Sequence, residues 1–398
     1  MGTDKSLSRL TIRGFKSIME LNDFELKKLN VFVGANGAGK SNLISFFKML
    51  HILMDDNIAD YIRENGGVGD VLYNGRKCTA KMRFSMNFRE HGYRFTVVPT
   101  TNDSVVLSKE ALYYEHGSTG WWQLRESNDA FSSMVTEAKG NPLATEDGDL
   151  LLTEDGNVLV TETDGNSLDA ICSKYIYDTI MSWKIYHFHD TSSTAPMRHY
   201  QSAEDNDTLR HDASNIAPFL FRLREEGMTE YRDILEACQI VLPYLKEFLL
   251  KEKVYDKAKD IKKINLSWRT KSSDFPMQPH HLSDGSIRFI CLAAALLQPN
   301  LPSTLIIDEP ELGLHPEAIR VLGELINAAA KRTQVIVATQ SPLLIDQFGI
   351  DDIIIVNRKD DQSVFERLNK NDFDKWLEDY SVGELWTKNV IRGGVCHE

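Results

Sequence analysis

The chain has 398 residues, of which 42% are hydrophobic and 26% charged, and its net charge is −13. This composition is that of a globular protein with one large domain or two ordinary ones, and it argues against a surface built as a whole to bind nucleic acid. No stretch reaches the roughly 20 apolar residues that span a bilayer, and the N-terminus lacks the apolar core of a secretory signal. The five scattered cysteines favour reduced thiols. We therefore expect a cytoplasmic protein with no membrane partner.

The first motif along the chain is a phosphate-binding loop. Residues 34–41 read Gly-Ala-Asn-Gly-Ala-Gly-Lys-Ser and fit the pattern Gly-x-x-x-x-Gly-Lys-Ser/Thr. An apolar, β-rich run precedes the loop and helical spacing follows it, so backbone N–H groups and a helix N-terminus would surround phosphate oxygens. Lys40 would reach the β- and γ-phosphates, and the Ser41 hydroxyl would hold Mg²⁺. The residues predicted to contact the nucleotide here are Asn36, Gly37, Ala38, Gly39, Lys40, Ser41 and Asn42.

Strands are predicted on both sides of this loop, and those after it are expected to be antiparallel. Residues 10–29 read as two short strands followed by the strand that enters the loop. Beyond the loop, alternating patterns predict strands over 80–88, 93–98, 107–114 and 121–124. Next come a helix running into a core strand over 174–189, a loop over 190–209, and a helical region over 216–250 interrupted at Gly227 and Pro243.

Two stretches carry unusual charge. Residues 143–166 repeat with a period of eight, are strongly acidic and have Asp-Gly turns, which predicts a small hairpin meander. This segment is either a tolerated surface insertion or a docking surface for a partner. Residues 246–271 hold nine Lys or Arg against four Asp or Glu. Such a run is either a solvated face or a contact surface for phosphate backbones.

From residue 280 onward, short apolar strands alternate with helices. We predict helices over 287–297 and 316–331 and strands over 303–307, 335–338 and 353–356, the last of the chain. This alternation implies a parallel sheet covered by helices on both faces.

One of these strands ends in two adjacent carboxylates, Asp308 and Glu309. Neighbouring side chains on a strand point to opposite sides, so the two acids can have different roles where the strand ends. We predict that Asp308 serves Mg²⁺ as a direct or indirect ligand. Glu309 would face the γ-phosphate and polarise the attacking water.

Further motifs carry a resemblance to a known family. The opening Leu10-x-Ile12-x-Gly-Phe-Lys-Ser, ahead of a phosphate loop, resembles that of the SMC/RecF-like ATPases, relatives of the ABC ATPases. Residues 282–286, Leu-Ser-Asp-Gly-Ser, resemble the ABC signature Leu-Ser-Gly-Gly-Gln, and 335–342 lie where the switch motif would be, with Gln340 in place of His. Because Gln cannot take up a proton, we expect the γ-phosphate to be sensed but hydrolysed slowly.

The resemblance implies roles for several residues. Lys16 and Ser17 would lie near the nucleotide phosphates. The alternative for Lys16 is an exposed side chain in a hairpin. Ser283, Gly285 and Ser286 would complete the ATP site of a second copy, so the mechanism would include a homodimer. The alternative for Ser283 is a helix N-cap without any partner.

The implied fold is α/β: an ABC-type P-loop ATPase head with a mainly parallel sheet core, an antiparallel β lobe, a helical lid and a small β-hairpin insertion. No long heptad run is present, so coiled-coil arms are not expected. The predicted parts are an N-terminal ATPase lobe (1–135), the acidic insertion (136–170), a core strand with a helical lid (171–279) and a C-terminal ATPase lobe (280–398).

The chain resembles free-standing ATPase heads of bacterial anti-phage and overcoming-lysogenisation-defect-like systems. This implies an ATP- and Mg²⁺-dependent dimeric switch that regulates a separately encoded effector, such as a nuclease, with DNA as a further candidate ligand. Three alternatives stay open: a RecF-like repair ATPase that binds DNA directly, the nucleotide-binding subunit of a transporter, and a non-catalytic scaffold.

Overall fold

The computed structural model describes residues 5–55, 58–114, 121–129, 132–139, 168–256 and 261–391. The acidic repeat over 143–166 lies outside the described residues. The chain forms two compact units: unit 1 contains residues 1–27, 36–183 and 356–365, and unit 2 contains residues 28–35, 184–355 and 366–398.

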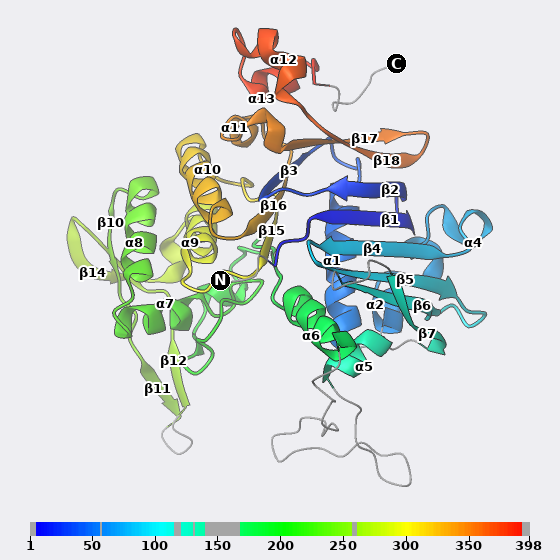
Figure 1. Cartoon of the computed structure of the whole chain (residues 1–398). Coiled ribbons are helices and arrows are strands. Elements are labelled where there is room, and N and C mark those ends of the chain that lie inside the picture. The colour runs from blue at the N-terminus through cyan, green and yellow to red at the C-terminus, as the bar shows by residue number, and fades with distance from the viewer. Residues whose placement is uncertain are drawn as a thin grey trace. The chain divides into compact units, whose positions relative to one another are not determined.

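Unit 1 is built on an antiparallel six-stranded sheet with the order β2-β1-β4-β5-β6-β7 (Figure 1). The predicted strands on both sides of the phosphate loop are confirmed. Their bounds are β1 Arg9–Phe15, β2 Ile18–Glu25, β4 Met82–Phe88, β5 His91–Pro99, β6 Val105–Tyr114 and β7 Trp121–Asp129.

One face of this sheet is apolar and buries aromatic rings. Phe84 of β4 stacks on Phe46 of helix α1 (Lys40–Asp55), with ring centroids 5.4 Å apart. Phe15 and Phe95 extend the cluster, at 5.8 and 4.8 Å from Phe84. Aromatic pairs of this kind contribute about 0.5–1.5 kcal/mol each beyond the area that they bury. The helix that follows the phosphate loop is therefore fixed to the sheet by its apolar side.

The remaining helices of unit 1 are short apart from the last, which leads into Trp183. They are α2 Ile58–Glu64, α3 Val68–Val71, α4 Gly75–Cys78, α5 Ser133–Lys139 and α6 Leu168–Met181.

Unit 2 contains most of a second six-stranded sheet, with the order β18-β17-β3-β16-β15-β8. Neighbouring strands from β17 to β8 run parallel, as the apolar pattern predicts. The bounds are β3 Leu29–Val33, β8 Lys184–Tyr186, β15 Thr304–Asp308, β16 Gln334–Thr339, β17 Ile353–Lys359 and β18 Gln362–Arg367.

The prediction that the strand over 353–356 is the last is wrong, because β18 follows it. Asp360 and Asp361 join β17 to β18, and both have positive φ, at 48° and 61°. Two consecutive residues with positive φ are typical of a tight hairpin turn, and Asp tolerates this conformation better than most residues. The turn before β18 could therefore have been predicted from this Asp-Asp pair.

Helices and small sheets complete unit 2. The helices include α7 Ile216–Glu225, α8 Thr229–Val241, α9 Asp284–Leu297, α10 Pro316–Ala330, α11 Pro342–Ile345, α12 Lys370–Leu377 and α13 Val382–Thr387, with short 3₁₀ turns at η1 Pro196–Arg198, η2 Pro279–His281 and η3 Ile350–Asp352. The small sheets are β10-β13-β14 and β11-β12-β9, formed by β9 Gln201–Ser202, β10 Leu245–Phe248, β11 Lys253–Asp256, β12 Ile261–Ile264, β13 Trp268–Thr270 and β14 Ser273–Met277.

The prediction of helix up to residue 250 is wrong beyond Pro243. Proline has no N–H to continue a helix, and α8 ends at Val241. Leu245 and Phe248 are buried, and β10 pairs instead with β13. The α/β class, the mainly parallel sheet and the antiparallel sheet are confirmed. None of the described helices is long and apolar enough to cross a membrane.

Candidate functional site

The phosphate loop in unit 1 has the local geometry that the motif predicts. Gly37 and Gly39 have φ of 82° and 113°, values that side chains rarely adopt. Helix α1 begins at Lys40, and the N–H groups of Asn42 and Leu43 donate to Gly39 O at 3.1 and 3.2 Å. Lys40 is buried, while Ser41 is exposed at the start of the helix. The loop therefore presents backbone N–H groups and a hydroxyl at a helix N-terminus.

A serine far along the chain supports this loop. Ser363 Oγ donates to Ala38 O at 2.6 Å and lies 2.6 Å from Ser17 Oγ, which also accepts from Asn42 Nδ2 at 2.6 Å. A Cβ on Gly39 would lie 1.9 Å from Ser363 Oγ, so only glycine fits here. The structure thus brings Ser17 to the phosphate loop, and its approach to nucleotide phosphates stays a prediction. The contribution of Ser363 was missed, because its only signal was the Asp-Asp turn before it.

Lys16 lies beside Ser17 in a left-handed conformation, with φ of 48°. Its Nζ donates to Ser45 Oγ of α1 at 3.2 Å and to Asn65 Oδ1 at 3.1 Å. Burial, and then the charge of Lys48, lower the pKa of Lys16 below its usual value. The side chain is therefore held against the helix that follows the loop, and its approach to phosphates stays a prediction.

In unit 2, three strands end at one edge of the parallel sheet. Val33, the last residue of β3 before the loop, is paired with Thr339 of β16, and Ala338 of β16 is paired with Asp308 of β15. Gln340 follows this edge directly. Parallel α/β sheets characteristically bind ligands outside the carboxyl ends of their strands.

Glu309 follows Asp308 with φ of 45°, and its N–H donates to Ala338 O at 2.8 Å. Most other non-glycine residues with positive φ are Asn or Asp, which tolerate this conformation, whereas Glu309 and Lys16 have long side chains. Such a conformation costs on the order of 1–3 kcal/mol and is often found at functional sites. It turns the chain sharply after Asp308.

Glu311 was given no role by the sequence analysis, yet it contacts the switch segment. Its Oε1 accepts from Thr339 Oγ1 at 2.5 Å and from Gln340 N at 3.4 Å, while its Oε2 has no hydrogen-bond partner among the described residues. Burial raises the pKa of Glu311, and the nearby Glu309 raises it further against the lowering effect of these hydrogen bonds. Glu311 therefore connects the loop after Asp308 to the end of β16.

Replacing Glu311 with Gln is expected to raise the unfolding midpoint at pH 8, with nucleotide absent and EDTA present. Because the pKa is raised in the folded state, the contribution of Glu311 to stability is full below its unfolded value of about 4.3 and is lost as the pH rises through the folded value. The stability difference between the Gln variant and the wild type should shrink toward zero at low pH, where Glu311 is protonated in both the folded and the unfolded state. Thermal unfolding across the pH range measures it.

Glu317 is the matched control on α10. The hydrogen bond and charge of Arg320 lower the pKa of Glu317, so Gln should not stabilise the protein there at pH 8. A Glu311→Gln variant whose stability difference from the wild type does not change with pH would contradict the assignment.

The signature-like segment forms the N-terminus of α9. Ser283 is the N-cap, and its Oγ accepts from Ser286 N at 3.1 Å and lies 2.8 Å from Ser286 Oγ. Ser283 is exposed and Ser286 is buried. A Cβ on Gly285 would lie 2.3 Å from Gly313 O, so glycine is needed for α9 to pack against the loop after Asp308.

Two arginines hold this helix start in place. Arg288, which is 5% exposed, donates to Phe188 O at 2.8 Å, to His189 O at 3.1 Å and also to Leu312 O. Arg198 donates to Pro279 O and Leu282 O, both at 2.9 Å, and to Asp284 Oδ1 at 2.7 Å. The signature-like segment is thereby joined to the loop that follows Asp308 and Glu309.

His281 and His315 make local hydrogen bonds. His315 Nδ1 accepts from Glu317 N at 3.4 Å, and His281 Nδ1 accepts from Gln278 N at 3.0 Å. No group of three or more His, Cys, Asp or Glu side chains within the described ranges is arranged to hold a metal ion.

Comparison with known proteins places the chain in a family. The family described as "AAA domain, putative AbiEii toxin, Type IV TA system" matches residues 29–346. This span contains the phosphate loop, the signature-like segment, Asp308, Glu309 and Gln340. The chain belongs to this AAA family. Its members are nucleotide-binding ATPases as a class, in agreement with the ATPase predicted from the sequence. No sequence among the curated proteins matches the chain.

Three solved structures are similar to the chain. The SMC head bound to the C-terminal winged-helix domain of ScpA is 15% identical, covers 93% of this chain and 99% of its own, and has a TM-score of 0.49. The SMC head domain with an extended coiled coil, bound to the C-terminal domain of ScpA and derived from Pyrococcus furiosus, is 14% identical. It covers 94% of this chain and 98% of its own, with a TM-score of 0.49. The SMC head domain from Thermotoga maritima is 12% identical, covers 91% of this chain and 99% of its own, and has a TM-score of 0.40. The longest described helix of this chain, α1, has 16 residues.

Proposed function

We propose that this protein is an ATP-binding, slowly hydrolysing switch whose homodimer regulates a separately encoded effector, such as a nuclease, in bacterial anti-phage defence. One observation carries the proposal. The strand that enters the phosphate loop ends beside the strand that leads to Gln340, which in turn lies beside the strand that ends in Asp308 and Glu309. The parts of an ATPase site thus leave the sheet at one edge, in a chain whose family is that of nucleotide-binding ATPases.

The loop residues divide the binding of ATP and Mg²⁺ among them. The backbone of residues 36–39 and the ammonium of Lys40 would hold phosphate oxygens, and a glycine that tolerates no Cβ supports this fit. The Ser41 hydroxyl and the Asp308 carboxylate are oxygen ligands of the kind that Mg²⁺ prefers. Bound Mg²⁺ would neutralise phosphate charge.

Hydrolysis requires a group that orients and deprotonates water. We assign this role to Glu309, which the sharp turn after Asp308 supports, and Gln340 would donate a hydrogen bond to the γ-phosphate. The Gln340 amide cannot act as a proton acceptor, so we expect a slow turnover suited to a timed switch.

The signature-like segment would act on another copy. Ser283 and Gly285, with Ser286 behind them, would contact the γ-phosphate of the partner, so that ATP joins two heads. Arg288 of α9 would couple a movement of this helix to the loop after Glu309, because its guanidinium group donates to Phe188 O and to Leu312 O. An effector bound to one head could then respond to the nucleotide of the other.

The proposal is tested by the mass of the purified chain in solution. We expect a monomer without nucleotide and a dimer with Mg²⁺ and a non-hydrolysable ATP analogue, measured by light scattering, together with slow ATP turnover. Affinity capture from the native cell should retain an effector in a nucleotide-dependent manner. A chain that binds ATP without any change in mass or in captured proteins would contradict the switch.

A further inference from the structure

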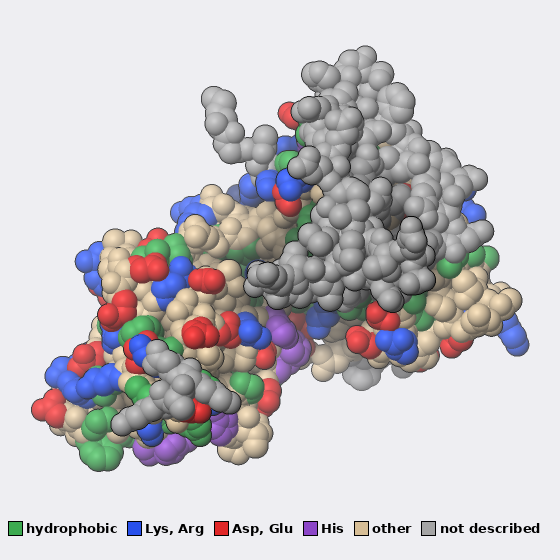
Figure 2. Space-filling view, turned by 90° about the horizontal axis from the view of Figure 1, so that it is seen from below, with side chains coloured by type: hydrophobic (Ala, Val, Ile, Leu, Met, Phe, Trp, Pro, Cys, Tyr) green, Lys and Arg blue, Asp and Glu red, His purple; other side chains and the backbone are tan. Residues whose placement is uncertain are grey.

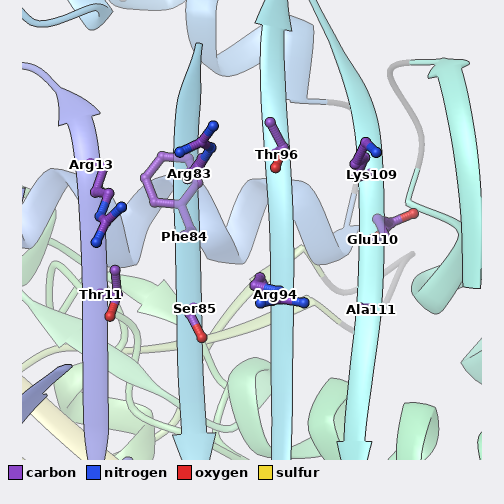
Figure 3. A pocket seen from close by; sticks show the side chains of 10 residues that line it. All are labelled: Thr11, Arg13, Arg83, Phe84, Ser85, Arg94, Thr96, Lys109, Glu110 and Ala111. Carbon is purple, nitrogen blue, oxygen red and sulfur yellow. The ribbon is translucent and has the colours of Figure 1, made fainter. Parts of the chain in front are cut away.

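The outer face of the antiparallel sheet in unit 1 is unexpectedly basic. A shallow cavity of about 510 Å³ lies on it, lined by Thr11, Arg13, Arg83, Phe84, Ser85, Arg94, Thr96, Lys109, Glu110 and Ala111 (Figure 3). Figure 3 shows the four basic side chains standing on four neighbouring strands, β1, β4, β5 and β6. In a chain with a net charge of −13, this grouping runs against the composition.

Strand register explains how these side chains gather. Arg13 is paired with Arg83, Arg83 with Thr96, and Thr96 with Lys109, which forms one row across the sheet. The next row on the same face, two residues away, runs from Thr11 through Ser85 to Arg94. Residues between these rows, such as Phe84, are buried. This face of the sheet therefore carries two neighbouring rows of basic and hydroxyl side chains.

The direct pairing of Arg13 with Arg83 is unfavourable for the fold alone. Like charges directly opposite one another on neighbouring strands destabilise a sheet. Arg13 also meets Glu20 at 3.4 Å and Asn22 at 2.7 Å at the sheet edge, but Glu20 is half-exposed and such surface pairs contribute about 0–1 kcal/mol. An anion that lies across both arginines would offset this repulsion.

We propose that this face, called here the arginine face and defined by Arg13, Arg83 and Arg94, binds the phosphodiester backbone of a nucleic acid. Lys109 is left out of the definition, because the register places Glu126 of β7 opposite it. The proposal concerns unit 1 only and does not depend on ATP turnover.

The dimensions suit a phosphate backbone. Neighbouring strands are about 4.8 Å apart, so β1 and β5, two steps apart, are separated by about 10 Å. Over about 10 Å of its axis, one strand of a duplex carries about three phosphates. Three guanidinium groups match three phosphates in number, and Thr11, Ser85 and Thr96 add hydroxyl donors.

The lining also favours a backbone over other ligands. Pockets for small molecules are mainly apolar, whereas the lining side chains of this one that are not buried are cationic or carry a hydroxyl group. Its one aromatic residue, Phe84, turns its ring into the core, so no base could stack on it. We therefore expect binding without sequence preference.

The basic stretch over 246–271, the earlier candidate for nucleic-acid contact, is a weaker one in its described part. Lys262 pairs with Glu252 at 3.2 Å, Arg269 with Glu247 at 2.8 Å and Lys246 with Asp274 at 3.8 Å. Figure 2 shows Lys and Arg side chains mixed with Asp and Glu around this part of unit 2. Residues 257–260, which include two of its lysines, lie outside the described residues.

The test compares two triple variants of the full chain. Arg13→Gln, Arg83→Gln and Arg94→Gln together remove the arginine face, and Lys253→Gln, Lys262→Gln and Lys263→Gln remove the same charge from β11 and β12. Binding of a short fluorescein-labelled DNA duplex is followed by anisotropy from low to physiological salt. For the arginine variant we expect at least about tenfold weaker binding at low salt and a salt slope smaller by about 2–3. The lysine variant should keep the wild-type slope.

Folding is checked by thermal unfolding, and single Arg83→Gln serves if the triple variant is unstable, with a slope smaller by about 0.9. Three results would overturn the proposal: no binding of the DNA duplex or of an RNA duplex by the wild type at low salt, loss of binding only in the lysine variant, or competition by poly-glutamate as strong as by DNA of equal charge. The last result would identify an acidic peptide as the ligand.

Discussion

Glu309→Gln is expected to abolish steady ATP turnover while ATP binding is kept. The side chains have the same size, so the turn at Glu309 and the bond from its N–H to Ala338 O remain. Gln cannot accept a proton from water, and loss of a general base costs on the order of 10²–10⁴ in rate. Because ATP is then bound but not cleaved, the dimer should accumulate. Phosphate release and light scattering with Mg²⁺ and ATP measure the two effects.

Glu317→Gln is the control for this substitution. Glu317 lies on α10 of the same unit, is exposed and pairs with Arg320 at 2.7 Å, so its loss should leave turnover unchanged. Wild-type turnover in Glu309→Gln would assign the base to another residue. Loss of ATP binding in the same variant would instead mean that the turn after Asp308 supports the nucleotide site structurally.

Much of the fold could be predicted because local sequence and tertiary structure agree. Gly37 and Gly39 of the phosphate loop have the positive φ that only glycine adopts easily, and Ser283 caps α9 where the signature-like pattern begins. Leu305, Ile306 and Ile307 form a buried strand because nothing polar interrupts them. In these places one short segment determines its own structure.

The sequence-based predictions fail where residues far away in the sequence determine the local structure. Residues 245–248 look helical by spacing, but Pro243 ends α8 and Trp268 of β13 offers a strand partner. Ser363 is 325 residues away from Ala38, so no local pattern could reveal that it supports the phosphate loop. The role of Glu311 could not be predicted from local sequence either, because its partners Thr339 and Gln340 lie at the end of another strand.

The arginine face illustrates the same limit for function. Arg13, Arg83 and Arg94 come from three strands, and none belongs to a basic run that composition would reveal. In the run that composition does reveal, 246–271, three basic residues of the described part pair with acidic neighbours: Lys246, Lys262 and Arg269. Sheet register, and not sequence proximity, decides where charge accumulates on a β face.

Mixing two inactive variants is expected to restore ATP turnover if the signature-like segment acts on another copy. Lys40→Ala removes the ammonium that would hold the phosphates. Ser283→Asp keeps an N-cap as good as serine for α9 but would place a negative charge against the partner's γ-phosphate. Each variant alone should lose turnover by on the order of 10² or more. Ser283→Asn, which caps α9 without charge, should be affected less.

A mixed dimer contains one intact site, with Lys40 from the Ser283→Asp chain and Ser283 from the Lys40→Ala chain. With random mixing, half of the dimers are mixed and half of their sites are intact, so turnover should recover to roughly a quarter of the wild-type value. Steady-state phosphate release across mixing ratios measures this, and native mass spectrometry of tagged chains confirms the mixed dimers. Mixed dimers without recovered turnover would contradict a shared site, because the intact pair of Lys40 and Ser283 would then be present and still inactive.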